Sequence, residues 1–299
     1  MMKPLRKAKR KGSGVGVLAG IHQFWSRFGK NKGAVAGLCV LLVVVFSAVF
    51  ADVISSYPPD RPAVGPRLHS PSAEYPMGTD NLGRDVFSGV VHGSRVSLMI
   101  GVAASLTSIA LGTLVGSIAG FFGGWVDEVS MRLSELFQSM PRFLFALVIV
   151  VFFGSSIWNV VIVIGLLSWP RAARMVRAEF LRLRQSEFVL AAKALGTSSR
   201  RIIFRQILPN TLHILLVTGT LEVGAAIVIE AGLSFLGAGD PNLVSWGHML
   251  HNAQRFLRTA WWFSVFPGGA IFVTVLAMNM VGDGINDALN PRLLYMHSR

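Results

Sequence analysis

The sequence predicts an all-α integral membrane protein with six transmembrane helices. Of its 299 residues, 52% are hydrophobic and only 14% are charged, whereas soluble globular domains carry about 25% charged residues. Six apolar stretches meet or approach the roughly 20 residues that a helix needs to cross a bilayer. Lysine and arginine gather beside some of these stretches and not beside others, which is the bias that membrane insertion produces.

The six expected spans follow one another with short polar separators. The first is about as long as a full span, and longer than the ~7–15-residue core of a cleaved signal, so we expect it to be retained as an anchor. The third begins polar and contains Pro141, which a span tolerates where neighbouring helices satisfy the freed carbonyl. Only "FGSSIWN" separates the third from the fourth. The spans cover residues 33–51, 96–122, 126–153, 157–174, 211–235 and 261–281.

The distribution of basic residues predicts which side each connection occupies. Residues 1–32 hold nine Lys/Arg and no acid, and residues 171–205 hold nine Lys/Arg against two acids. Residues 52–95 hold four basic and five acidic side chains. Six crossings from a cytoplasmic N-terminus put both basic blocks and the tail, residues 290–299, in the cytoplasm. The net charge of +13 is thus explained by topology, and nucleic acid is not an expected partner.

The same map divides the chain into five parts. Six prolines between residues 58 and 76 rule out a regular helix or central strand, which predicts an ordered or semi-rigid loop outside. Asp80 and Asp85 follow it in "GTDNLGRD", where turn formation is favoured over a cation site. The parts are a basic cytoplasmic segment (1–32), the first helix (33–51), the extracytoplasmic loop (52–95), the membrane core (96–289) and the cytoplasmic tail (290–299).

Residues 188–210, "FVLAAKALGTSSRRIIFRQILPN", predict a short helix, a turn and a second helix on the cytoplasmic side. Gly196 suits the left-handed conformation that ends a helix, and Ser198 suits the start of the next. We expect the second helix to end at Pro209. Both ends are tied to spans, which argues against a DNA-reading helix pair. Docking to a protein partner and lying on anionic lipid are equally compatible with the pattern.

This segment resembles the EAA loop of permease subunits of ATP-binding-cassette (ABC) transporters. Leu190 stands where the general pattern has Glu, as is usual in one branch, the dipeptide/oligopeptide/nickel permeases, and Gln206 stands where it commonly has Ile or His. "GTDNLGRDVFSGVVHGSRVSL", "GFFGGWVDEVSMRL", "EAGLSFLGAGD", "SWGHML" and "NMVGDGINDALNPRL" are similar, in order, to recurrent segments of that branch's C component. The EAA positions that fit are Ala191, Ala192, Gly196, Leu208 and Pro209.

The resemblance implies a type I ABC importer permease fold in a bacterial inner membrane. It implies that the loop couples the spans to an ATPase, with Arg200 and Arg201 pairing with partner acids or lipid headgroups. The implied partners are a second homologous permease, two ATP-binding subunits and an extracytoplasmic solute-binding protein. Short peptides are the expected cargo, with nickel or another small solute as the alternative within the same fold.

Phosphate-binding and catalytic signatures are absent from the sequence. No G-x-x-x-x-G-K-[ST] run occurs, so ATP hydrolysis is expected on partner subunits and no cofactor is predicted. An ion-coupled secondary transporter is the competing class, although such proteins usually show inverted repeats and several intramembrane acids.

Two acids fall within the fifth span. An unpaired charge in lipid is costly, so Glu222 and Glu230 are candidates for the translocation path, with buried structural pairing as the alternative. His248 and His251 share one helical face outside, but two ligands do not make a metal site, and none is predicted. Trp261 and Trp262 suggest an interfacial aromatic anchor.

Two further features concern packing. The glycines at 112, 116 and 120 predict close helix packing on the second span. Cys39, the only cysteine, is expected to be a free, buried small hydrophobe.

Overall fold

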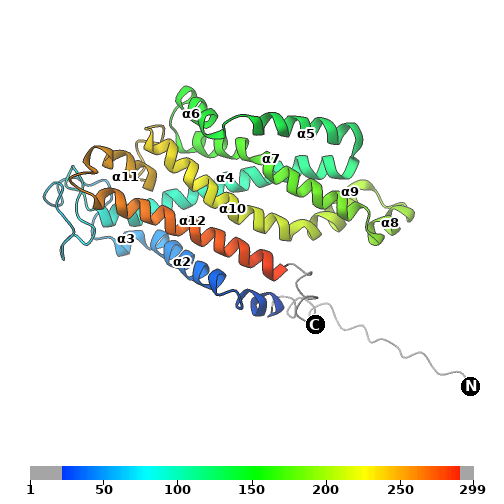
Figure 1. Cartoon of the computed structure of the whole chain (residues 1–299), viewed down its shortest axis with the longest axis horizontal. Coiled ribbons are helices and arrows are strands. Elements are labelled where there is room, and N and C mark those ends of the chain that lie inside the picture. Colours follow the sequence, from blue (N-terminus) through cyan, green and yellow to red (C-terminus); the bar gives the residue numbers. More distant parts are fainter. Residues whose placement is uncertain (1–21, 290–299) are drawn as a thin grey trace, which may run out of the picture.

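The computed structural model describes residues 22–289, where every regular element is a helix apart from one isolated bridge between Thr79 and Asp85. Most helices lie along the long axis, with α11 at one end and α8 and α9 at the other (Figure 1). The predicted all-α class is confirmed. The elements are α2 (Lys32–Val49), α3 (Ala51–Ile54), α4 (Val86–Phe122), α5 (Gly124–Ser139), α6 (Arg142–Phe153), α7 (Ile157–Arg184), α8 (Glu187–Ala194), α9 (Ser199–Ile202), the π-helical turn η1 (Ile203–Ile207), α10 (Leu208–Phe235), α11 (Trp246–Ala253), the 3-10 turn η2 (Gln254–Phe256) and α12 (Trp262–Leu289).

Within residues 22–289, five helices are individually long and apolar enough to cross a membrane, namely α2, α4, α7, α10 together with the α9 and η1 segments before it, and α12. A sixth crossing requires α5 and α6 together, and these are bent by 83°. The expectation of one continuous helix over 126–153 is therefore wrong. Pro141 disfavours helical geometry at the residue before it, and Met140 is extended, with ψ 137°.

Other boundaries extend beyond the predicted spans. The α4 helix begins at Val86, inside the predicted loop 52–95, because the Asp85 carboxylate accepts the Ser88 N–H at 2.9 Å and caps it. The α7 helix continues to Arg184 and α12 to Leu289. The predicted basic segment 1–32 and tail 290–299 lie largely or wholly outside the described residues.

Among the described residues, the most extensive packing between two helices joins α4 to α7, at the glycines whose spacing predicted close packing. A Cβ on Gly112 would lie 2.8 Å from the Ala173 nitrogen, and one on Gly120 would lie 2.6 Å from the Phe180 Cβ. Gly116 directly faces the Ala173 carbonyl. Only glycine permits this backbone approach, so the two helices form one closely packed unit.

The proline-rich loop is ordered, as predicted, and closes the α11 end of the bundle. The Asp80 carboxylate accepts the N–H groups of Leu82 and Arg84 at 2.7 and 2.8 Å, which confirms its turn role. Trp262 is buried and donates its indole N–H to the Thr79 carbonyl at 3.1 Å. The expectation that Trp262 is an interfacial anchor is therefore wrong, whereas Trp261 is 55% exposed.

The α2 helix packs against α12 through one narrow face. Ala34, Gly37 and Leu41 are buried at helical spacing, and a Cβ on Gly37 would lie 2.9 Å from the Ala277 carbonyl. Cys39 falls on the opposite face and is exposed, so the expectation that it is buried is wrong. The buried face of α2 is the one that carries Ala34, Gly37 and Leu41 at helical spacing, and Cys39 is not on that face.

Candidate functional site

The helix pair at the α8–α9 end of the bundle is joined by a glycine turn at the predicted position. Gly196 has φ +72°, in the left-handed region that glycine enters without steric cost. The Thr197 N–H donates to the Ala192 carbonyl at 3.0 Å, and the Gly196 N–H donates to the Lys193 carbonyl at 2.9 Å. These two bonds form a complete Schellman motif, which sets a defined angle between α8 and α9.

The second helix of the pair does not end at Pro209, as the sequence suggested, but runs through η1 directly into α10. The Leu208 N–H reaches the Ile203 carbonyl, five residues back. A proline ring would crowd the carbonyl four residues before it in a regular helix, and the wider π turn just ahead of Pro209 relieves that clash. The α9 segment is therefore a direct extension of a membrane-spanning helix.

One face of this pair is anchored in the bundle. Val189, Ile202 and Ile207 are at most 1% exposed, and Ala192 is 7% exposed. They pack against the ends of α4 and α7, through Phe121, Val176, Phe180 and Leu183.

One charged side chain contacts the same junction. The Lys193 ammonium lies 5.5 Å from the Phe121 ring centroid, a cation–π geometry. These contacts attach α8 to the ends of α4 and α7.

The opposite face of the pair points away from the bundle and mixes apolar and basic groups. Leu195 is 85% exposed and Phe204 is 64% exposed, without a covering element among the described residues. Of the predicted coupling residues, Ala192 is buried and Leu208 half-buried. The exposed ones are Ala191, Gly196, Arg200, Arg201 and Pro209. We call the exposed set Phe188, Leu190, Ala191, Leu195, Arg200, Arg201 and Phe204 the outer coupling face.

Glu222 lies inside the bundle on α10 and is 3% exposed. Its Oε1 lies 3.9 Å from Nη1 of Arg171 on α7, close enough for an ion pair but too far for a hydrogen bond. Arg142, at the start of α6, is near enough for its charge to act on Glu222 as well. Sequence reasoning found Glu222 but missed both arginines, because they lie on other helices and approach Glu222 only through the packing of distant segments.

Glu230 lies eight residues after Glu222 on α10 and is 2% exposed. Its Oε1 accepts the hydroxyls of Ser234 at 2.7 Å and of Ser245 at 2.8 Å. Ser245 also caps α11 by accepting the His248 N–H at 3.1 Å. This geometry ties α10 to α11, as in the structural alternative considered for this residue. Its placement in the translocation path stays a prediction.

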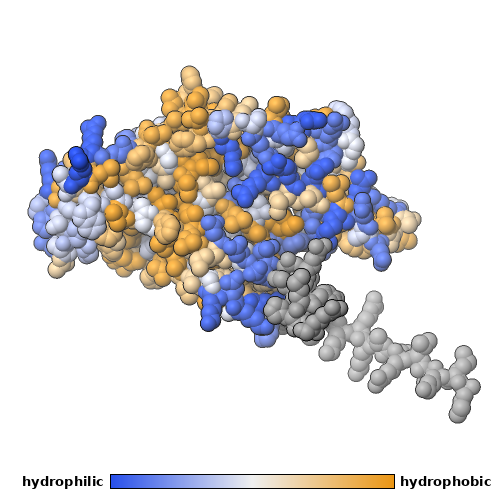
Figure 2. All heavy atoms as spheres, in the orientation of Figure 1, coloured by the Kyte–Doolittle hydropathy of each residue, from blue (hydrophilic) through white to orange (hydrophobic). Residues whose placement is uncertain are grey.

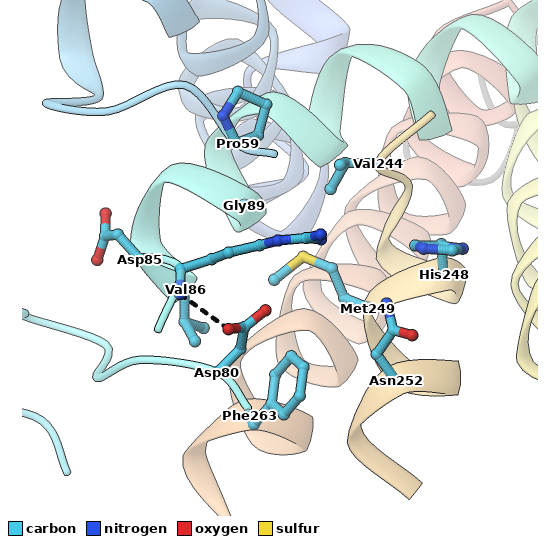
Figure 3. A pocket seen from close by; sticks show the side chains of 11 residues that line it. Pro59, Asp80, Asp85, Val86, Gly89, Val244, His248, Met249, Asn252 and Phe263 are labelled. Atoms are coloured by element: carbon cyan, nitrogen blue, oxygen red, sulfur yellow. Dashed lines mark hydrogen bonds between the residues drawn. The ribbon is translucent and has the colours of Figure 1, made fainter. Parts of the chain in front are cut away.

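The two histidines on α11 make separate contacts. Nδ1 of His251 is 2.8 Å from the Phe235 carbonyl. His248 borders a hollow of about 20 Å³, shared with Asp80, Met249 and Phe263 (Figure 3), which has room for about one water molecule. Within residues 22–289, no group of three or more His, Cys, Asp or Glu side chains is arranged to hold a metal.

Comparisons with known proteins agree with this architecture. Residues 112–295 match the family described as binding-protein-dependent transport system inner membrane component, and residues 21–80 match the N-terminal transmembrane domain of oligopeptide transport permease C. A chain of the MetNI methionine ABC transporter, solved in inward-facing conformations, superposes with a TM-score of 0.55 at 17% identity. The match covers 71% of this chain and 97% of that one, and it supports the type I permease fold.

Relatives of similar length are considerably closer in sequence. A protein named as a peptide permease from Brucella suis biovar 1 is 42% identical over 89% of each chain. The di/tripeptide permease DppC of Pseudomonas aeruginosa is 38% identical over 91% of this chain and 92% of its own. The oligopeptide permease OppC of Bacillus subtilis is 38% identical over 89% and 88%. The chain therefore belongs to the family of binding-protein-dependent transport system inner membrane components, whose members are multi-pass permease subunits of ABC importers.

Proposed function

We propose that this protein is one permease subunit of an ABC importer for short peptides, forming half of the translocation path. The relatives named above are peptide, di/tripeptide and oligopeptide permeases. The observation that carries the coupling role is the outer coupling face, where large apolar side chains stand beside Arg200 and Arg201. Exposed apolar groups rimmed by charge are typical of a protein interface.

The partners follow from what one chain cannot supply. The sequence lacks a nucleotide-binding loop, so two ATP-binding subunits provide the energy, and the outer coupling face docks on one of them. A second, homologous permease completes the path, and an extracytoplasmic binding protein delivers the peptide. Both termini and the outer coupling face then lie in the cytoplasm of a bacterium, with the α11 end outside, in accordance with the basic blocks.

The helix pair transmits movement because it is stiff at both attachments. Its inner face is packed against α4 and α7, and α9 continues into α10. A shift of the docked ATPase therefore moves three spanning helices together, which suits rigid-body rocking between inward- and outward-open forms. Hydrophobic residues cover much of the middle of the face seen in Figure 2, where lipid and the second permease would contact this chain.

Nickel or another small solute is the second candidate cargo. It would use the same fold and the same ATPase coupling, so only a measurement of which solute is taken up distinguishes the two cargoes. An ion-coupled secondary transporter is the alternative from another class, and it would need neither the ATPase nor the binding protein.

Reconstitution tests these alternatives directly. The chain is purified with its second permease and ATPase subunits, placed in proteoliposomes with the binding protein, and supplied with radiolabelled trialanine. We expect uptake that requires internal ATP and is blocked by vanadate. Uptake that follows a proton gradient without any ATPase subunit would overturn the proposal, and uptake of Ni²⁺ instead of trialanine would reassign the cargo.

A further inference from the structure

A basic hollow opens at the bend between α5 and α6, beside the middle of α7. Its volume is about 390 Å³, within the range of small-molecule sites. The polar groups that line it are Gln138 from α5, Arg142 from α6, and Ser168, Arg171 and Arg174 from α7.

The groups around this hollow are mainly hydrogen-bond donors. Arg174 donates to the Gln138 Oε1 and so occupies the amide's acceptor, while the buried Gln138 Nε2 has no partner. Within residues 22–289, Arg171 has only the distant Glu222 contact, and neither Arg142 nor Arg174 forms an ion pair with a carboxylate. The hollow therefore has an excess of positive charge and of unused donors, which an anionic acceptor would satisfy.

The position of the hollow argues against a lipid-facing surface. Arg171 lies fourteen residues after the start of α7, and Glu222 lies fourteen residues after the start of α10. At 1.5 Å per residue, each is about 21 Å along its helix, and Arg171 falls within the predicted span 157–174, three residues before its end. Charged groups at such depth face a water-filled space or protein. Hydrophilic residues gather over α5 and α7 in the half that carries α8 and α9 (Figure 2).

We propose that this hollow is a carboxylate-binding site on the translocation path. Arg142 and Arg174 contact the C-terminal carboxylate of a peptide there. The inference rests on the proposed function. Glu222 acts as a positioning residue that holds Arg171 against α10. Guanidinium groups recognise planar carboxylates with paired N–H donors, and a site with water access binds loosely enough to release its cargo.

Two peptides that differ only at the C-terminus test this step. The complete transporter in proteoliposomes takes up trialanine or trialanine amide with Arg142→Gln or Arg174→Gln in place. We expect about tenfold less uptake of trialanine, since charge-assisted bonds are lost, and a change of less than about twofold for the amide. Arg132→Gln is the matched control, because Arg132 lies on α5 in an exposed pair with Glu135, and it should alter neither peptide. Equal losses for acid and amide would indicate that the arginines serve folding or pair with an acid of the second permease, and would overturn the proposal.

A chemical probe gives the same information without the binding protein. In a Cys39→Ser background, Met140→Cys places a thiol in the lining of the hollow, and Leu136→Cys, one turn earlier, is the control outside it. We expect the hollow thiol to react faster with an anionic than with a cationic methanethiosulfonate, with Arg174→Gln reducing that ratio.

Trialanine should protect the thiol more than its amide does. A ratio that is the same at both cysteines, or protection that does not depend on the carboxylate, would overturn the proposal. If wild-type transporter takes up trialanine by ATP while these results fail, only this inference is lost and the proposed function stands.

Discussion

Gly116 of α4 lies directly against the main-chain carbonyl of Ala173 in α7. A side chain at this position would have to displace backbone, because a Cβ there would also lie 2.9 Å from the Val176 Cβ. The α4–α7 unit packs against the α8–α9 pair, and its α7 helix lines the basic hollow. A substitution that forces α4 and α7 apart should therefore lower the stability of the whole bundle, and not only one functional step.

Gly116→Leu is expected to lower stability by about 1–3 kcal/mol through overpacking, seen as a lower melting temperature of the purified transporter. Gly269→Ala is the matched control, since Gly269 is also helical but nothing lies within 4 Å of an added Cβ. That variant should be neutral or slightly stabilising, because alanine favours helix. Equal melting temperatures for both variants would contradict the close approach of α4 and α7.

The turn at Gly196 predicts a graded series of substitutions. The φ of +72° costs an L-residue about 1–2 kcal/mol, less for asparagine, and open space surrounds the position. Proline cannot adopt this angle and removes the N–H that bonds Lys193. ATP-driven uptake should therefore decrease from Gly to Asn to Ala to Pro, with Gly196→Pro inactive but inserted normally. Uptake and membrane content are measured together, and normal uptake by the proline variant would refute the coupling role.

Local sequence signals predicted the features that depend on neighbouring residues in the chain. Helical spacing located the spans, and Gly196 marked its turn. The bend at Pro141 and the merging of α9 into α10 were missed, because a proline's effect depends on whether adjacent turns can widen or must break.

Contacts between segments that are distant in the chain could not be predicted from local sequence patterns. The sequence identified Glu222 as a functional candidate, but not Arg171, fifty-one residues away along the chain. Arg171 approaches Glu222 through the packing of α7 against α10, and Arg142 reaches the same space because α6 follows the bend. Trp262 has the sequence pattern of an interfacial anchor, yet its indole N–H donates a hydrogen bond to the Thr79 carbonyl. No local sequence pattern predicts this contact.

The two faces of α8 predict two different kinds of loss. Leu195→Ser removes an 85% exposed side chain and should leave the melting temperature unchanged while weakening co-purification with the ATPase subunit. Val189→Ala deletes a fully buried group and should cost about 1–2 kcal/mol of stability. Val53→Ser, equally exposed at 82% but on α3, is the control for a changed apolar surface. Unaltered ATPase binding by the Leu195 variant would argue against docking at the outer coupling face.

The α11 end of the bundle should become less stable in acid because of His248. Burial, then the charges of His251 and Arg84, hold the pKa of His248 below its ordinary value of 6.5, against the attraction of Asp240. Between that lowered pKa and 6.5 the unfolded chain binds more protons than the folded one. Stability from this group is therefore complete above pH 6.5 and is lost as the pH falls toward the folded pKa.

Melting temperatures measured from about pH 8 to about pH 5 test the effect. The decrease in acid should be smaller for His248→Gln than for wild type. His69→Gln replaces an exposed histidine of the proline-rich loop and should leave the slope unchanged. A slope that is identical in all three proteins would assign the acid sensitivity to other groups.

Substitution of Glu230 can show whether this residue links α10 to α11 or contacts cargo in the translocation path. Its Oε1 accepts two hydroxyls, from Ser234 and Ser245, and a glutamine carbonyl can accept the same two bonds without a charge. We expect Glu230→Gln to retain ATP-driven uptake within about twofold. Ser245→Ala should lower stability by about 1 kcal/mol, because it removes both the Glu230 bond and the cap of α11. A large loss of uptake in Glu230→Gln with an unchanged melting temperature would instead place this carboxylate in the path, since only contact with cargo requires the charge itself.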